Sequence, residues 1–410
     1  MAKASYFIGV DIGGTFTDVV LAEAASHRLY TAKTLTTPDS PAQGVIAAMR
    51  EAMDQAQATP ADVRRVVHAT TLATNLILER KGSRVAYVTT RGFGDLFVIG
   101  KERVVGADRY NVLLEKSPPL VSRRLTLEIR ERINRLGEVV VALDEQAAVE
   151  GLARLAREDP QAVAICFFHS YANPAHERAM AELVRKHLPR AYVALSSEIW
   201  PEFREYERAS TTVMSAYVGP TISSYVETLD ADLRKMGLTG SFEIMQSSDG
   251  VMSAAAVARK PVYSVESGPA AGVIAAAHLG KLCNQPNVIS FDMGGTTAKA
   301  GLIRHGVLPN DPCQFVNFRV RATGIVPKPE LNRAAPGDGN SRRALKGTRK
   351  AYFAEAGGFA DARVYDRARL SPGDVLTGPA IVEEPDSTTV CPPGYAVRVD
   401  EYLNLHINRG

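Results

Sequence analysis

Two short stretches of the sequence carry the residue types that bind phosphate groups. Each places Asp-x-Gly-Gly-Thr directly after an apolar run: "YFIGVDIGGTFTDVVL" contains Asp11, and "NVISFDMGGTTAKAGLIR" contains Asp292. Glycines let a phosphate approach backbone N–H groups, threonine hydroxyls donate to phosphate oxygens, and an aspartate can hold Mg²⁺ or its water. One copy alone is also typical of an ordinary β-turn, but two copies favour a pair of turns that grip one nucleotide from opposite sides.

The first stretch predicts a β-hairpin over residues 6–23. Thr15, Thr17 and the apolar run 19–21 favour a second strand after the two glycines. A dinucleotide-binding loop would instead carry Gly-x-Gly-x-x-Gly and open a helix. The pattern therefore disfavours a Rossmann site.

Alternating strands and helices surround these turns and must position them. Apolar periodicity predicts helices over 40–56, 71–82, 144–158 and 174–188, and strands at "RRVVHA", "RVAYVTT", "AVAICFF" and "AYVALS". A long helical pattern follows over 210–237, with an interruption expected near Gly219 and Pro220. Such alternation predicts an α/β fold in which helices cover a sheet.

The chain is long enough for two or three domains. Its 410 residues are 45% hydrophobic and 23% charged, which is the composition of an ordinary globular protein. After Arg304, prolines, glycines and short β-like pieces predominate. We predict domains at 1–200, 201–306 and 307–410, the last being small and mostly β, with an exposed loop around 333–349.

Charge and cysteine content exclude several functional classes. The net charge is only +3, without a long run of one sign, so we predict neither a nucleic-acid partner nor an anionic membrane surface. No apolar run approaches the length of a membrane span, and Asp11 interrupts the only apolar run near the N-terminus. The four cysteines are far apart, which favours scattered thiols and a cytoplasmic location over a zinc or disulfide framework.

Several long stretches occur together, in one order, along nearly the whole chain. They include "GVDIGGTFTDVVL", "VVHATTLATNLILERKGSRVAYVTTRGFGDLFVIG", "SSEIWPEFREYERASTTVMSAYV", "SVESGPAAGVIAAA", "SFDMGGTTAKAGLI" and "GPAIVEEPDSTTVCPPG". With them the sequence resembles the hydantoinase/oxoprolinase A-subunit family, which includes N-methylhydantoinase A, 5-oxoprolinase and the related β subunits of acetone and acetophenone carboxylases. The resemblance implies an α/β core like that of actin, sugar kinases and heat-shock ATPases (ribonuclease H-like).

The resemblance also implies ATP-dependent chemistry with Mg²⁺. Family members phosphorylate the carbonyl or amide oxygen of a cyclic amide or ketone, usually with a B-type partner subunit, so we expect homo- or hetero-oligomers. Asp11 and Asp292 would serve as catalytic and metal-holding residues, and Lys299 would reach the γ-phosphate unless it is an outward-facing strand lysine. The remaining phosphate-binding positions are Gly13, Gly14, Thr15, Thr17, Gly294, Gly295, Thr296 and Thr297.

Two further polar clusters have alternative interpretations. His68, Thr70, Thr71 and Asn75 lie at a strand-to-helix junction, where they either cap the helix or line a substrate site. The run "PEFREYERAS" places charged side chains at helical spacing, and we interpret Arg204, Glu205, Glu207 and Arg208 as a solvated, ion-paired face rather than as catalytic groups.

The chain departs from the family after the second turn. The glycine-rich stretches that complete the second half of the family's ATPase are missing, and the sequence passes from "AKAGLIRHG" to "VNFRVRATG" within a short distance. We therefore predict an incomplete second half with exposed apolar faces, such as that of "PAAGVIAAAHLGKL". The leading function is an A-type hydantoinase or 5-oxoprolinase subunit, impaired in this form; a non-catalytic nucleotide-binding or assembly subunit and a ketone carboxylase subunit are the alternatives.

Overall fold

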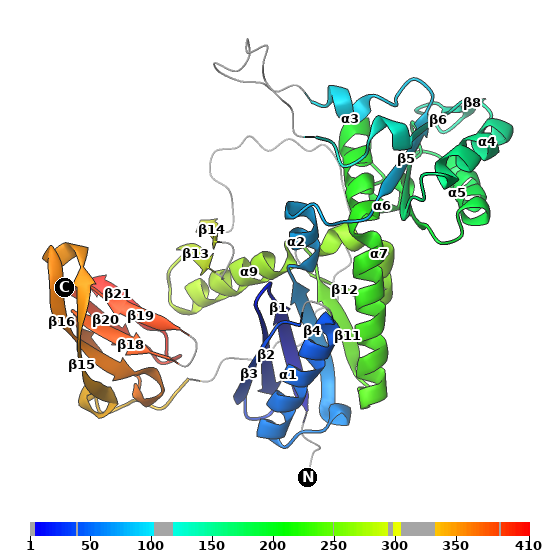
Figure 1. Cartoon of the computed structure of the whole chain (residues 1–410). Helices are drawn as coiled ribbons and strands as arrows, with labels where there is room; N and C mark the ends of the chain where they lie inside the picture. Colours follow the sequence, from blue (N-terminus) through cyan, green and yellow to red (C-terminus); the bar gives the residue numbers. More distant parts are fainter. Residues whose placement is uncertain are drawn as a thin grey trace. The chain divides into compact units, whose positions relative to one another are not determined.

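The protein is described by a computed structural model (Figure 1). It describes residues 5–37, 40–101, 118–248, 250–293, 298–304, 333–384 and 387–410. The chain forms two compact units, one built chiefly from residues up to 322 and the other from residues 323–410. The predicted domain boundaries at 200/201 and 306/307 stay predictions, and the second lies outside the described residues.

The larger unit contains a six-stranded sheet that includes the predicted N-terminal hairpin. Strands β1 (Tyr6–Ile12), β2 (Phe16–Glu23) and β3 (Leu29–Leu35) form an antiparallel meander. Strands β4 (Val63–Thr70) and β11 (Ser241–Met245) then add in parallel, and β12 (Val251–Ser253) closes the edge. The strand order is β12-β11-β4-β1-β2-β3.

One face of this sheet is buried against helix α1 (Pro41–Ala56). Side chains alternate along β1, so Ile8, Val10 and Ile12 enter the core with Met49 of α1, whereas Asp11 points to the opposite face. The prediction of a hairpin followed by a helix is therefore confirmed. The short helix α2 (Leu72–Leu78) follows β4 and ends earlier than its sequence pattern indicated.

A second sheet of four parallel strands lies in the same unit (Figure 1). Its order is β10 (Tyr192–Leu195), β9 (Ala162–Cys166), β5 (Val85–Thr90) and β6 (Thr126–Ile129). Every residue of β5 and β9 is buried, as expected for a parallel sheet covered on both faces. The accompanying elements are α3 (Leu96–Ile99), β7 (Arg132–Ile133), β8 (Val139–Val141), α4 (Glu145–Ala156), α5 (Ala175–His187) and α6 (Ser196–Ile199).

Helix α7 (Glu205–Met236) packs on both parts of the larger unit (Figure 1). Its 32 residues extend about 48 Å at 1.5 Å per residue. The predicted interruption is wrong, because the helix runs through Pro220 and begins five residues earlier than expected. Tertiary packing explains this outcome: Val218 and Ile222 are buried on either side, and a Cβ on Gly219 would lie 2.5 Å from the Tyr192 ring.

The second predicted turn also follows a hairpin strand. After α8 (Ala254–Arg259) and α9 (Ser267–Leu282), strands β13 (Asn287–Met293) and β14 (Ala298–Arg304) pair antiparallel, with Asp292 opposite Lys299. One face packs on α9, and the other leaves Ile289, Phe291 and Leu302 exposed. Ser267 and Gly280 are the only buried residues of α9, and its large apolar side chains Val273, Ile274, Leu279 and Leu282 are half-buried. The expected exposure of this apolar helix therefore stays a prediction.

The smaller unit is mostly β, as predicted. One sheet has the order β15-β16-β18-β19 and the other β17-β20-β21. Its strands are β15 (Leu345–Phe353), β16 (Gly358–Asp366), β17 (Val375–Thr377), β18 (Ala380–Glu383), β19 (Thr388–Cys391), β20 (Tyr395–Val399) and β21 (Leu405–Arg409). The loop expected over 333–349 ends at residue 344, because pairing with β16 draws 345–349 into a strand despite its polar side chains.

Candidate functional site

The turn of the first hairpin is exposed at its tip and tied together beneath it. Gly14 and Thr15 are exposed, while the Gly13 N–H donates to the Phe16 carbonyl at 2.9 Å. Thr17 lies on the inner face and is fully buried. Its Oγ1 is 3.2 Å from the Thr36 Oγ1, which in turn donates to the Gly13 carbonyl at 2.9 Å. In the described structure, Thr17 thus supports the turn from below, and its predicted contact with phosphate stays a prediction.

Asp11 lies at the carboxyl end of β1, on the face opposite α1. In the register of the hairpin, Asp11 pairs with Asp18 of β2, and Asp18 forms an ion pair with Lys33 at 3.2 Å. The first turn of α9 also lies close to Asp11. A Cβ on Gly268 would lie 3.2 Å from the Asp11 Oδ1 and 3.6 Å from the Thr71 Cγ2. Only a glycine leaves this space open without displacing the carboxylate.

Hydrogen bonds fix the start of α9 against the end of β4. The Thr70 N–H donates to the Ser267 Oγ at 3.1 Å, and this hydroxyl donates to the Thr70 carbonyl at 3.0 Å. The Glu266 N–H donates to the Thr74 Oγ1 at 3.0 Å. The N-terminus of a 16-residue helix, with its partial positive charge, is therefore held beside Asp11. These contacts join residues 197 and 192 positions apart, so no local sequence pattern predicted the pairing of Ser267 with Thr70 or of Glu266 with Thr74.

The threonines at the junction between β4 and α2 mostly serve the backbone. Thr70 Oγ1 accepts a hydrogen bond from the Leu72 N–H at 3.0 Å, a local turn contact just before the N-cap residue Thr71, whose own side chain makes no capping bond. Thr71 donates to the Ile12 carbonyl from its N–H at 3.1 Å and from its Oγ1 at 3.3 Å. Thr71 thereby joins this junction to the end of β1, close to Asp11. Asn75, one turn further on, is half-buried.

His68 lies apart from this cluster, inside the core. Its side chain is fully buried, its Nε2 is 2.8 Å from the Tyr225 hydroxyl, and its ring packs against Phe242. Burial lowers the pKa of His68 to about 4, so the ring is neutral near pH 7. The structure therefore places His68 beneath the junction and does not bring it to the surface with Thr71.

Only part of the second turn can be placed. Asp292 is exposed at the end of β13; Gly294, Gly295, Thr296 and Thr297 lie outside the described residues, as does the side chain of Lys299. Because side chains alternate along a strand, Asp292 lies on the same face of β13 as Ser290. This face lies toward α9: a Cβ on Gly301, which pairs with Ser290, would lie 2.4 Å from Val273 of α9 and 2.6 Å from the Ser290 Oγ. Val273 is five residues, or about 7.5 Å, beyond Gly268 along the helix. Thus the first half of α9 contacts both hairpins.

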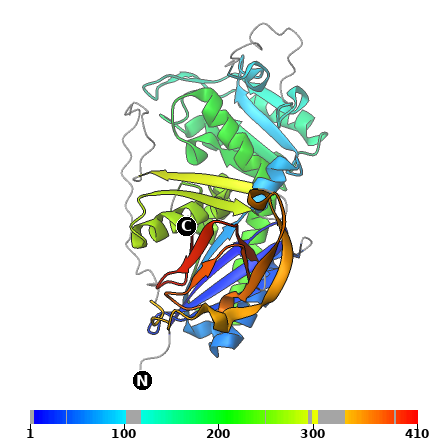
Figure 2. The same cartoon turned by 90° about the vertical axis from the view of Figure 1, so that its left-hand side faces the viewer.

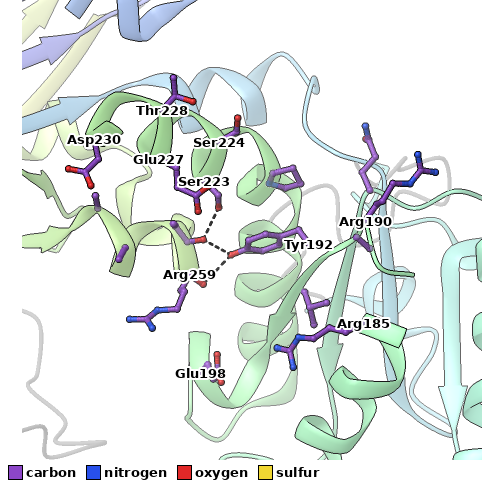
Figure 3. Close-up of a pocket in the computed structure, with 17 residues that line it drawn as sticks. Arg185, Arg190, Tyr192, Glu198, Ser223, Ser224, Glu227, Thr228, Asp230 and Arg259 are labelled. Carbon is purple, nitrogen blue, oxygen red and sulfur yellow. Dashed lines mark hydrogen bonds between the residues drawn. The ribbon is translucent and has the colours of Figure 1, made fainter. Parts of the chain in front are cut away.

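A separate pocket lies elsewhere in the larger unit, between β10, α5, α7 and α8 (Figure 3). Its volume is about 810 Å³, and its charged lining is Arg185, Arg190, Glu198, Glu227, Asp230 and Arg259. The Tyr192 hydroxyl is 3.1 Å from the carbonyls of Ala258 and Arg259, and the Ser223 Oγ donates to the Ala258 carbonyl at 2.7 Å. Burial raises the pKa of Tyr192. No residue predicted from the repeated motif lines this pocket, and the hydroxyls of Tyr192 and Ser223 are engaged in local hydrogen bonds.

Family comparisons cover nearly the whole chain. Residues 7–188 match the hydantoinase/oxoprolinase N-terminal region, residues 208–321 match hydantoinase/oxoprolinase, and residues 313–410 match the hydantoinase/oxoprolinase C-terminal domain.

Curated relatives include an uncharacterized protein of Methanocaldococcus jannaschii, 40% identical over 301 residues, which are 73% of this chain and 43% of the relative. The caprolactamase subunit alpha of Pseudomonas jessenii is 32% identical over 75% of this chain and 44% of its own length. The 5-oxoprolinase of Saccharomyces cerevisiae is 30% identical over 81% of this chain and 28% of its own length. The chain thus spans less than half the length of these relatives.

Two solved structures share the fold. The nucleotide-free structure of acetone carboxylase superposes with a TM-score of 0.85 over 100% of both chains at 16% identity. The ATP-dependent caprolactamase of Pseudomonas jessenii superposes with a TM-score of 0.61 over 72% of this chain and 43% of that chain, at 32% identity. The predicted fold class, an actin-like ATPase-type α/β core, is confirmed. Among the described residues, no helix is both long and apolar enough to span a membrane.

Proposed function

Because the chain belongs to the hydantoinase/oxoprolinase family, we propose that it is an ATP-dependent A-type subunit acting on a cyclic amide such as a hydantoin or 5-oxoproline. The amide oxygen would attack the γ-phosphorus, the bond from that phosphorus to the β–γ bridging oxygen would break, and ADP would leave. The former carbonyl carbon would then carry a phosphate leaving group, which makes hydrolytic ring opening feasible. Catalysis of such a transfer depends on positioning and on charge stabilisation.

The observation that carries this proposal is the position of the α9 N-terminus beside Asp11. Gly268 leaves a space open next to the Asp11 carboxylate. The exposed tip of the turn, Gly14 and Thr15, comes directly after the strand that contains Asp11. Helix N-termini and glycine turns present backbone N–H groups to phosphate oxygens, and a nearby carboxylate suits Mg²⁺. These residues therefore fit a nucleotide bound with Mg²⁺. When bound, Mg²⁺ would neutralise part of the negative charge of the phosphate groups.

Within this proposal the residues divide into three groups. Asp11 and Asp292 would hold Mg²⁺ through their carboxylates, and Lys299 would contact the γ-phosphate. Thr71 and Asn75, at the carboxyl end of β4, line the substrate side, whereas His68 supports them from the core. The phosphate contacts would come from the two glycine turns: Gly13, Gly14 and Thr15 in the first, and Gly294, Gly295, Thr296 and Thr297 in the second. The buried Thr17 would support the first turn from below.

Calorimetric titration with MgATP tests the proposal. The 410-residue chain is compared with an Asp11→Ala, Asp292→Ala double variant and with a control, Asp95→Ala, Asp232→Ala, that removes two surface carboxylates engaged in ion pairs. We expect binding by the parent chain and the control, and its loss in the double variant. Equal MgATP affinity in all three proteins would contradict the proposed site.

The name of the caprolactamase relative, subunit alpha, supports a partner subunit of the B type. Adding a family B subunit and 5-oxoproline, a hydantoin, or acetone with bicarbonate to the MgATP-bound chain would identify the substrate class through phosphate release. Release with acetone alone among these substrates would assign the chain to the ketone carboxylases.

A non-catalytic role is the second candidate, because the second hairpin is a two-stranded sheet, within the described residues, with an exposed apolar face. An incomplete second half can bind phosphate groups without closing on them. Nucleotide binding without phosphate release, with partner and substrate present, would favour this assembly role.

A further inference from the structure

A second, smaller cavity lies at the carboxyl end of the four-stranded parallel sheet. It has a volume of about 240 Å³ and is formed by residues that follow β9 and by the start of α7. Its lining is Phe168, His169, Tyr171, Phe203, Arg204, Glu205 and Arg208. Open α/β sheets bind ligands outside the carboxyl ends of their strands, and this position matches that rule. Neither hairpin turn contributes to the cavity.

Arg208 is the most unusual of these residues, because it is only 2% exposed. Its Nη1 donates to the Phe167 carbonyl and the Ser196 Oγ, both at 2.8 Å, and also to the Ser170 Oγ. Its Nε has no partner among the described residues, and all of its hydrogen bonds to them come from Nη1. The interpretation of Arg208 as part of a solvated, ion-paired face is therefore wrong. Arg208 lies in the first turn of α7, on the side of the helix that faces the core.

The charge of Arg208 is balanced without use of its remaining edge. Glu177 is fully buried, and its Oε1 accepts from the Ser196 Oγ at 2.6 Å and from the Phe167 N–H at 3.0 Å. Its Oε2 accepts from the Ser197 N–H at 2.9 Å. The link from Arg208 to Glu177 therefore runs through Ser196, and the carboxylate is satisfied where it lies. The Nε of Arg208 is buried and has no partner among the described residues, and Nε and Nη2 together form the guanidinium edge that binds a carboxylate with two parallel hydrogen bonds.

The other lining residues favour a flat anion. The Tyr171 ring lies 5.6 Å from the Arg208 Cζ, and Phe168 and Phe203 add further aromatic surface. Arg204 and the N-terminus of the long helix α7 add positive potential, against a single lining carboxylate, Glu205. A planar monoanion matches one guanidinium edge in a small aromatic cavity. A phosphate would bring a second charge and further oxygens that this edge cannot satisfy.

We propose that this cavity binds a small organic carboxylate with a flat, apolar body, whose two oxygens accept hydrogen bonds from the Nε and Nη2 of Arg208. The site goes beyond the function proposed for the hairpins, and its test needs no nucleotide.

Benzoate and benzamide provide the test, because they share a ring and a shape and differ in charge. Ligand-detected NMR titrations of the full chain, without ATP, should give binding of benzoate and at least about tenfold weaker binding of benzamide and of inorganic phosphate. Equal binding of benzoate and benzamide would overturn the proposal, because the pocket would then recognise only the ring. Tighter binding of phosphate than of benzoate would overturn the assignment to carboxylates.

Variants locate the binding. Arg208→Lys keeps a positive charge but lacks the planar edge, so benzoate affinity should fall about tenfold. Arg259→Lys, in the larger pocket of Figure 3, is the matched control and should leave affinity unchanged. If Arg208→Lys does not fold, Phe203→Ala gives the second readout: this lining residue is 42% exposed, and its loss should weaken benzoate binding severalfold at an unchanged melting temperature. Unchanged affinity in whichever of these lining variants folds would overturn the proposal.

Discussion

The two Asp-x-Gly-Gly-Thr hairpins share a local geometry and differ in what surrounds them. Both pair antiparallel with the same offset, Ile12 opposite Thr17 in one and Met293 opposite Ala298 in the other. The first is flanked by β3 and β4 within a six-stranded sheet, and α1 covers its inner face. The second forms a two-stranded sheet among the described residues and packs on α9 (Figure 2, yellow strands).

This difference shows what the motif itself determines. The glycine turn and the alternating strands are sufficient to produce a hairpin in either place. Burial depends on the elements that the rest of the chain supplies, so Leu21 is fully buried while Leu302 is 60% exposed. The following predictions test or refine this comparison, from the largest expected effect to the smallest.

Truncation of matched leucines should separate the hairpins most clearly. Leu21→Ala, in β2, removes a fully buried side chain and should destabilise the protein by about 2–5 kcal/mol. Leu302→Ala, in β14, should change stability by less than about 0.5 kcal/mol, because the side chain is exposed. Thermal and urea unfolding measure both. A large loss in Leu302→Ala would indicate that another chain covers the second hairpin in solution.

Acidification should destabilise the sheet that holds the first hairpin, through His68. Its folded-state pKa of about 4 lies below the unfolded value, so the unfolded chain binds the proton first as the pH falls. The contribution of neutral His68 is therefore present above pH about 6.5 and is lost between pH 6.5 and 4, to a total of about 3 kcal/mol.

Melting temperatures measured from pH 7 to pH 4 test this effect. The decrease should be shallower in His68→Gln than in the parent chain, whereas His278→Gln, at an exposed position on α9, should keep the parent slope. Parallel curves for the parent and His68→Gln would contradict the assignment.

A methyl group at Gly268 should weaken nucleotide binding with little loss of stability. The new Cβ would lie 3.2 Å from the Asp11 Oδ1, so the carboxylate must shift by a few tenths of an ångström. Because phosphate and metal sites depend on such positions, we expect the MgATP affinity of Gly268→Ala to fall about fivefold, or about 1 kcal/mol. Calorimetry measures the change, and an unaltered affinity would place the nucleotide away from the α9 N-terminus.

Gly272→Ala should have the smallest effect and the opposite sign. Gly272 lies one turn after Gly268 in the same helix, and a Cβ there would have no neighbour within 4 Å. Replacing an unstrained helix glycine by alanine should stabilise the protein by about 0.5–1 kcal/mol. A rise in melting temperature without a change in MgATP affinity is expected, and a fall would show that this surface of α9 is covered in solution.

Much of the fold follows from local patterns in the sequence. The two turns, the alternation along β1 and β2, and the amphipathic pattern of α1 predict elements that the structure contains. The course of α7 through Pro220 could not be predicted, because packing of Gly219 on Tyr192 overrides local propensity. The strand over 345–349 was missed for a similar reason, since its stabilisation comes from pairing with β16.

The sequence by itself determined which residues have phosphate-binding chemistry and that each glycine turn follows a strand, because both properties depend on neighbours along the chain. Only the tertiary structure decided which side chains reach a site. It placed Gly268 beside Asp11, buried His68 and Thr17, and turned Arg208 from an expected surface charge into a buried guanidinium. The physical reason is that burial and partner choice depend on contacts between residues far apart in sequence, such as Thr70 with Ser267 and Arg208 with Ser170.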